Sequence, residues 1–233
     1  MSTRHLPSAG GSFIAAFKYS IPVLLGYMAI GIAFGLLMSD AGYPWWLSLV
    51  MSVVMYAGAG QFIAVGLFAA GTTLWEAALV QLVVNARHIA YGLSMLKKYQ
   101  RTGKFRLYLI FSLTDETFAL LSSMPEEKTG DGDRGKFMFY VAILDQFYWI
   151  AGSVIGAIAG NLIPFNLDGI SFALTALFIV LMIEQILRVK KPGIFIISAA
   201  AAILAVLVLP GRFSLLAAMA LALVLAPLTE KGK

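Results

Sequence analysis

The sequence contains no cysteine and only two histidines among its 233 residues. The lack of cysteine excludes a disulfide framework, a thiolate metal site and a cysteine nucleophile. A metal site would have to be built from carboxylates alone, and we expect no metal or other cofactor. The zinc-protease, Walker and nucleophile-elbow motifs are also missing from the sequence. We therefore do not expect an enzyme.

Charged residues are scarce, at 12% of the chain, whereas soluble domains carry roughly 25%. Hydrophobic residues make up 60%, and the mean hydropathy is +0.86. Apolar stretches of about 20 residues, long enough to span a bilayer, recur along the chain. The net charge of +5 does not indicate a nucleic-acid partner, because the bases lie in short loops beside apolar runs, as in cytoplasmic loops of membrane proteins. The partner that the composition predicts is the lipid bilayer.

We therefore predict an all-α, polytopic integral membrane protein, a single transmembrane domain over residues 1–233 with a polar cytoplasmic tail at residues 1–18. The first apolar run is longer than the apolar core of a signal peptide, about 7–15 residues, so we expect it to stay as a span. The predicted membrane segments are Tyr19–Met38, Trp46–Ala70, Leu74–Leu96, Leu107–Ser123, Phe137–Gly160, Ile170–Leu187, Ile194–Leu209 and Phe213–Leu228.

The basic loops give the orientation and raise a conflict. If all the segments crossed fully from a cytoplasmic start, the basic loop Lys97–Arg106 would lie outside, against the positive-inside tendency. If Trp46–Ala70 and Leu107–Ser123 are broken or re-entrant, every basic loop and both termini lie inside. A glycine-rich patch and a polar Thr-Asp-Glu-Thr patch interrupt these two segments. About six to eight embedded segments are therefore expected, and a protein that crosses fully and breaks the tendency once remains the alternative.

Glycines recur every four residues in the first and fifth segments. Small residues at this spacing let helix backbones approach closely in lipid. We predict a helix-packing role for Gly31, Gly35, Gly152, Gly156 and Gly160.

Polar residues occupy the middle of the third segment. Gln81, Asn85 and His88 fall on one helical stripe, with Arg87 beside it. A charge at bilayer depth costs about 2.5–3.5 kcal/mol or more, and it is rarely kept without a partner or an aqueous cavity. Arg87 lies about 15 Å along the helix from the basic loop at Lys97, which is long for a snorkelling side chain. We therefore predict a buried role for Arg87, with Asn85 and His88 as hydrogen-bonding or gating groups.

Carboxylates lie inside two other apolar segments. Asp115 and Asp145 each follow the start of a segment by about 12 Å of helix. They can pair with Arg87, bind a substrate ammonium or carry a proton. A structural ion pair with Arg87 is the plainer alternative. One cation cannot neutralise Asp115, Glu116 and Asp145 together, so at least one of these acids has another role or is protonated.

The glycine-rich patch in the second segment offers another binding surface. Main-chain N–H groups exposed at a break between Gly58, Gly60 and Gln61 would suit a substrate carboxylate. Tyr56, together with Phe62 and Tyr91, would bound an aliphatic side chain. A simple packing kink at these glycines is the alternative.

Several strings resemble one known family. They are Pro22–Tyr27 with Gly31–Gly35, Ala57–Phe62, Asn85-Ala86-Arg87-His88 with Tyr91–Ser94, and Leu113–Phe118. Together they resemble the AzlC family, the large subunits of bacterial branched-chain amino-acid exporters, over nearly the whole chain. The resemblance implies proton-driven export of leucine, isoleucine and valine. It also implies a bacterial inner-membrane location and a small membrane subunit of the AzlD type as partner.

The residues and the resemblance together predict a secondary transporter of hydrophobic amino acids that works by proton antiport. In this hypothesis Arg87 or the Gly58–Gln61 backbone takes the substrate carboxylate. Asp115 or Asp145 takes the ammonium or a coupling proton. The alternatives are an exporter of another small solute, or a channel-like or regulatory membrane subunit whose Arg–Asp pair is purely structural.

Overall fold

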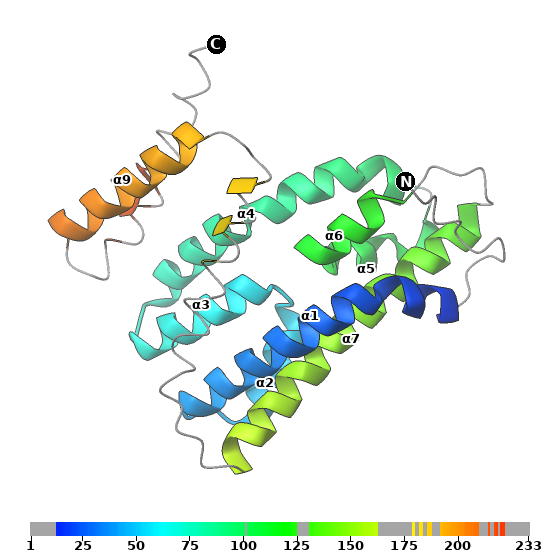
Figure 1. The fold of residues 1–233 in the computed structure, drawn as a ribbon, viewed down its shortest axis with the longest axis horizontal. Helices are drawn as coiled ribbons and strands as arrows, with labels where there is room; N and C mark the ends of the chain where they lie inside the picture. The colour runs from blue at the N-terminus through cyan, green and yellow to red at the C-terminus, as the bar shows by residue number, and fades with distance from the viewer. Residues whose placement is uncertain are drawn as a thin grey trace. The chain divides into compact units, whose positions relative to one another are not determined.

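The computed structural model describes residues 13–100, 102–124, 131–162 and 192–209, with a few isolated positions between 179 and 221. Every regular element in these ranges is helical, as predicted (Figure 1). The helices are α1 (Phe13–Asp40), α2 (Trp45–Val54), α3 (Gly58–Ala69), α4 (Leu74–Tyr99), α5 (Arg106–Phe111), α6 (Asp115–Ser122), α7 (Asp131–Leu162) and α9 (Pro192–Val208), with a 3₁₀ turn at Gly103–Phe105. The predicted segments Ile170–Leu187 and Phe213–Leu228 lie largely outside the described residues.

The chain divides into two compact units. One contains α1, α2, α5, α6 and α7, most of α3, and α4 from Asn85 onward. The other contains the rest of α3 and α4, together with α9. Helix α9 has no ionisable residue and exposes Ile203 and Val206, whereas Ala201 and Ala205 are buried.

Within the described residues, two helices are long and apolar enough to cross a membrane, α1 and the stretch Arg134–Leu162 of α7. At about 1.5 Å per residue either one exceeds the ~30 Å hydrocarbon layer. Helix α1 begins at Phe13, within the predicted tail, because the helix continues past the apolar run and leaves Lys18 exposed. The number of full spans stays a prediction.

Helices α1 and α7 lie side by side at a glycine-lined contact (Figure 1). A Cβ on Gly35 would overlap the backbone oxygen of Ser153, and one on Gly156 would overlap the backbone oxygen of Ile32. The same contact includes Gly31, Gly152 and Gly160. Backbone approach of this kind is available only to glycine, so these positions set the spacing of the two helices.

Both segments that were expected to be interrupted are broken. In Trp46–Ala70 the break lies at residues 55–57, between α2 and α3, where Tyr56 has a left-handed φ of 41°. In Leu107–Ser123 it lies at residues 112–114, between α5 and α6. Thr114 then caps α6 by accepting a hydrogen bond from the backbone N–H of Thr117 at 3.3 Å. These breaks bring polar side chains into the interior of the first unit.

Candidate functional site

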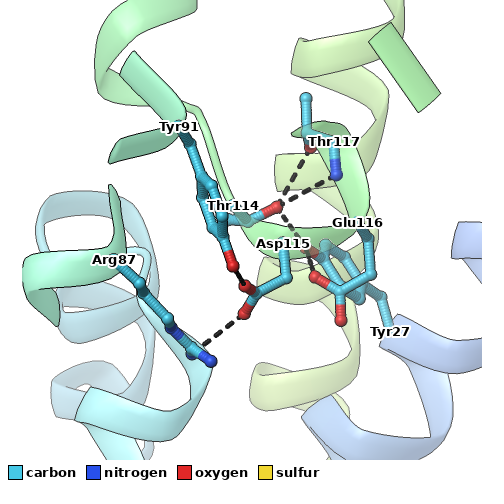
Figure 2. Close-up of polar contacts among 7 residues, drawn as sticks. All are labelled: Tyr27, Arg87, Tyr91, Thr114, Asp115, Glu116 and Thr117. Atoms are coloured by element: carbon cyan, nitrogen blue, oxygen red, sulfur yellow. Dashed lines mark hydrogen bonds and ion pairs between the residues drawn. The ribbon is translucent and has the colours of Figure 1, made fainter. Parts of the chain in front are cut away.

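An ion pair joins α4 to the first residue of α6. The Nη2 atom of Arg87 lies 2.9 Å from Oδ2 of Asp115, and the two side chains are 26% and 23% exposed. The hydroxyl of Tyr91 donates to Oδ1 of Asp115 at 2.5 Å (Figure 2). The buried Nε of Arg87 has no hydrogen-bond partner among the described residues. In this conformation the guanidinium therefore keeps one buried donor without a partner among the described residues.

Aromatic rings pack against Tyr91, the tyrosine that bonds the ion pair. The ring of Tyr91 stacks on Phe118 of α6, with centroids 4.5 Å apart and planes 11° from parallel. The ring of His88 meets Tyr91 edge-on at 5.9 Å. Asn85 lies one helical turn before His88 on α4. The charged pair thus has an apolar, aromatic border.

The carboxylate of Glu116 forms hydrogen bonds with other partners than the carboxylate of Asp115. Its Oε2 accepts a hydrogen bond from the hydroxyl of Tyr27 on α1 at 2.7 Å. The same Tyr27 oxygen lies 2.6 Å from Oγ1 of Thr114 (Figure 2). Acidic groups in the first turn of α6 are also favoured by the helix dipole.

Asp145 lies in the middle of α7 and is completely buried. Its Oδ2 accepts a hydrogen bond from Oγ1 of Thr117 at 2.9 Å. Its Oδ1 has no hydrogen-bond partner in the described part of the chain. The predicted pairing of a deep carboxylate with Arg87 therefore involves Asp115, and Asp145 depends on a neutral hydroxyl.

The glycine-rich patch packs around Trp149. The amide of Gln61 is fully buried, donates to Oγ of Ser52 at 3.2 Å and accepts from Nε1 of Trp149 at 2.9 Å. A Cβ on Gly58 would lie 3.1 Å from the Trp149 ring. Tyr56 is buried beside them. In this conformation the Gln61 amide already has partners, so contact with a substrate would require it to exchange them.

The structure thus separates the sequence-predicted site residues into groups. The α4–α6 group contains Asn85, Arg87, His88, Asp115 and Glu116. The α3 group contains Tyr56, Gly58, Gly60 and Gln61. Asp145 meets α6 through Thr117.

Sequence reasoning missed two connecting side chains, Tyr27 and Trp149. Each lies in a long apolar helix, where an aromatic residue is most often core. Their hydrogen-bond partners, Glu116 and Gln61, are 89 and 88 positions away in the chain. A buried tyrosine O–H or tryptophan N–H usually has a hydrogen-bond partner. This tendency was the one signal that could have indicated a polar role for Tyr27 and Trp149.

The fold and the site define an all-helical membrane protein with polar groups inside its apolar helices. The family described as AzlC protein matches residues 22–163, and the chain belongs to this family. The resemblance inferred from the sequence motifs is therefore confirmed.

Named relatives agree with this assignment. The chain is 41% identical to the branched-chain amino acid transport protein AzlC of Bacillus subtilis (strain 168), over 77% of this chain and 70% of the relative. It is 44% identical to an uncharacterized membrane protein of Helicobacter pylori (strain ATCC 700392 / 26695), over 76% and 77% of the two chains. It is 32% identical to the inner membrane protein YgaZ of Escherichia coli (strain K12), over 78% and 77%. No solved structure matches the chain significantly.

Proposed function

We propose that this chain is the large subunit of a secondary transporter that exports branched-chain amino acids in exchange for protons. Membership of the AzlC family and the name of the Bacillus subtilis relative support the transport of this class of substrate. The single observation that carries the mechanism is the partly exposed ion pair of Arg87 and Asp115.

A zwitterionic amino acid bears the same two charges as this ion pair. In the proposed complex the substrate carboxylate binds Arg87, and a movement of this side chain exposes its buried Nε as a second donor for a bidentate contact. The substrate ammonium takes Asp115, which keeps its hydrogen bond from Tyr91. Because one ion pair is replaced by two matched contacts, no net charge is left unpaired in the site.

The aromatic border accounts for an aliphatic preference. Contact with the rings of Tyr91, Phe118 and His88 removes apolar surface from water, at about 0.8 kcal/mol per buried CH₂ group. Such a surface discriminates between side chains that differ by one methylene by only about 10–200-fold. We therefore propose a transporter that accepts leucine, isoleucine and valine together.

Proton coupling in this proposal belongs to the buried carboxyl groups. Asp145 is buried with no cation beside it among the described residues, so its neutral form is favoured. Glu116 accepts a hydrogen bond from one hydroxyl near the ion pair. An inward proton gradient would then drive substrate outward. We place the protein in the bacterial inner membrane as a multi-pass subunit with both termini cytoplasmic. It would work with a small membrane subunit of the AzlD type.

The rival function is a channel-like or regulatory subunit in which Arg87 and Asp115 only order the helices. The ion pair itself supports this rival, because a structural pair would look the same. The charge-swapped double variant Arg87→Asp with Asp115→Arg separates the two. It restores an ion pair but reverses the charges that a substrate would meet.

The test is leucine efflux from vesicles that contain the swapped variant and the small subunit, beside Arg87→Asp alone. Our proposal expects membrane levels and thermal stability to recover in the double variant while leucine efflux stays lost. Recovery of efflux together with stability would contradict the proposal and support the structural role.

A further inference from the structure

A continuous row of hydroxyl groups connects Glu116 to Asp145, two carboxyl groups with no ion-pair partner among the described residues. Figure 2 shows the row from Glu116 through Tyr27 and Thr114 to Thr117. Glu116 Oε2 lies 2.7 Å from the Tyr27 hydroxyl, which lies 2.6 Å from Thr114 Oγ1. Thr114 Oγ1 lies 3.1 Å from Thr117 Oγ1, which lies 2.9 Å from Asp145 Oδ2. All these distances fall in the ordinary hydrogen-bond range or close to it. We call this row the hydroxyl chain: Tyr27, Thr114 and Thr117 between Glu116 and Asp145.

The hydrogen count of the hydroxyl chain is informative. The row contains four oxygen–oxygen contacts but only three hydroxyl groups. Each hydroxyl supplies one hydrogen. If Glu116 and Asp145 were both ionised, one contact would bring two oxygens together with no hydrogen between them. One additional proton, on either acid, gives every contact its hydrogen.

Burial makes the missing hydrogen costly. Thr117 and Asp145 are 0% exposed, Tyr27 is 4% exposed and Thr114 is 6% exposed. Water therefore has little access to repair an unsatisfied contact, and an unpaired buried charge is more expensive still. The second oxygen of Asp145, Oδ1, has no partner among the residues described. The geometry thus favours a pair of acids that holds one proton, so that one acid is neutral and the other is a carboxylate bonded by the row of hydroxyl groups.

We propose that Glu116 and Asp145 share one proton, which moves between them along the hydroxyl chain. When the proton starts on Glu116, that acid gives it to the Tyr27 oxygen, and Tyr27 passes its own hydrogen to Thr114. Thr114 then passes its hydrogen to Thr117, and Thr117 passes its hydrogen to Oδ2 of Asp145. Each hydroxyl breaks one O–H bond and forms another, so only the acids change charge: Glu116 becomes a carboxylate and Asp145 becomes neutral.

Other titratable groups face both ends of the row. Tyr56, Tyr108 and Tyr148 interact electrostatically with Asp145. At the other end, Asp115 and Arg87 interact with Glu116.

The groups at the Glu116 end belong to the proposed substrate site, so the use of the hydroxyl chain in transport rests on the proposed function. A substrate that engages Arg87 and Asp115 would change the electrostatic field at Glu116 and thereby the position of the shared proton. The sharing itself is a property of the protein alone and does not require transport.

The test is infrared spectroscopy of the purified full-length protein, read in the band of protonated carboxyl groups at neutral pH. We expect one protonated carboxyl in the wild-type protein that responds to both Asp145→Asn and Glu116→Gln. In a Thr117→Val background, which interrupts the row with a side chain of similar shape, Glu116→Gln should no longer alter the band of Asp145. Ser153→Ala is the matched control, because it removes a buried hydroxyl of α7 that, among the described residues, bonds only the Trp149 carbonyl.

Two results would overturn the proposal. One is the absence of any protonated carboxyl that responds to Asp145→Asn. The other is an unchanged effect of Glu116→Gln in the Thr117→Val background. If Thr117→Val does not fold, Tyr27→Phe interrupts the same row at another point.

A flux measurement on the same variants keeps this inference separate from the proposed function. Thr117→Val should reduce gradient-driven leucine export at least about tenfold, as expected when a positioned proton-transfer group is lost. A shared proton without any leucine transport would leave the inference standing and refute the proposed function. Proton-driven leucine export without a shared proton would support the proposed function and refute the inference about the hydroxyl chain.

Discussion

The contact between α1 and α7 allows a prediction with a control in the same helix. Gly35 faces α7 so closely that a Cβ would overlap the backbone oxygen of Ser153 and the backbone nitrogen of Ala157. Gly26 lies on α1 with nothing within 4 Å of its Cβ position. Gly35→Ala and Gly26→Ala therefore make the same chemical change in opposite surroundings.

The expected magnitudes follow from these surroundings. Overpacking costs about 1–3 kcal/mol, and the upper part of that range applies because a helix backbone cannot rotate away as a side chain can. Replacing glycine by alanine within a helix stabilises the folded state by about 0.8–1 kcal/mol. Gly35→Ala should thus destabilise by about 1–2 kcal/mol and Gly26→Ala stabilise by about 0.5–1 kcal/mol.

Thermal unfolding of the two purified variants measures this difference. A gap of about 1.5–3 kcal/mol corresponds to roughly 3–12 °C in Tm for a chain of this size. Gly35→Ala should also reduce transport, because α1 carries Tyr27 and α7 carries Asp145. Equal Tm values for Gly35→Ala and Gly26→Ala would refute the close backbone contact.

Further predictions concern the ion pair, the buried amide and the helix cap. Arg87→Ala should destabilise the protein by about 1–3 kcal/mol, between the values for exposed and buried ion pairs. Adding Asp115→Ala should recover most of this loss in denaturant unfolding, while leucine export stays lost. Recovery of export in the double variant would count against a substrate role for the pair. Gln61→Leu should cost about 1–3 kcal/mol, since it leaves the Trp149 N–H unsatisfied, and unchanged tryptophan emission would contradict this. Thr114→Ala should destabilise by about 0.5–2 kcal/mol through loss of the cap, and Thr114→Ser should preserve stability; equal losses in both would argue against capping.

The interrupted segments show what the sequence predicts well. Glycines at positions 58 and 60 and the polar residues Thr114 to Thr117 disfavour a continuous apolar helix, so breaks in these two segments were predicted. The structure places them at residues 55–57 and 112–114. Gly58 and Gly60 lie in the first turn of α3, and residues 115–117 lie in the first turn of α6. Local composition therefore indicated that each segment is broken, but it placed each break a few residues too late.

The ion pair shows an intermediate case. Arg87 had to find a partner or an aqueous cavity, and the candidates were few because the chain has so few carboxylates. Sequence reasoning could not choose between Asp115 and Asp145. The choice depends on how α4 packs relative to α6 and α7, and the structure selects Asp115.

The hydroxyl chain could not be predicted from the sequence. Tyr27 meets Thr114 across 87 positions, and Thr117 meets Asp145 across 28. Such contacts depend on the α1–α7 spacing that glycines permit and on where α6 begins. The sequence also does not show which tyrosines and threonines are buried or which groups face them, so their presence alone carries little information.

The central claim is that the chain exports hydrophobic amino acids at the expense of a proton gradient. Its most direct test is efflux of preloaded labelled leucine from vesicles that contain this chain and a small AzlD-type subunit, with and without an imposed proton gradient. The account predicts saturable efflux that is accelerated by the gradient, is lost in Arg87→Ala and requires the small subunit. Leucine efflux that ignores the gradient, or no efflux of any branched-chain amino acid in the complete pair, would contradict it.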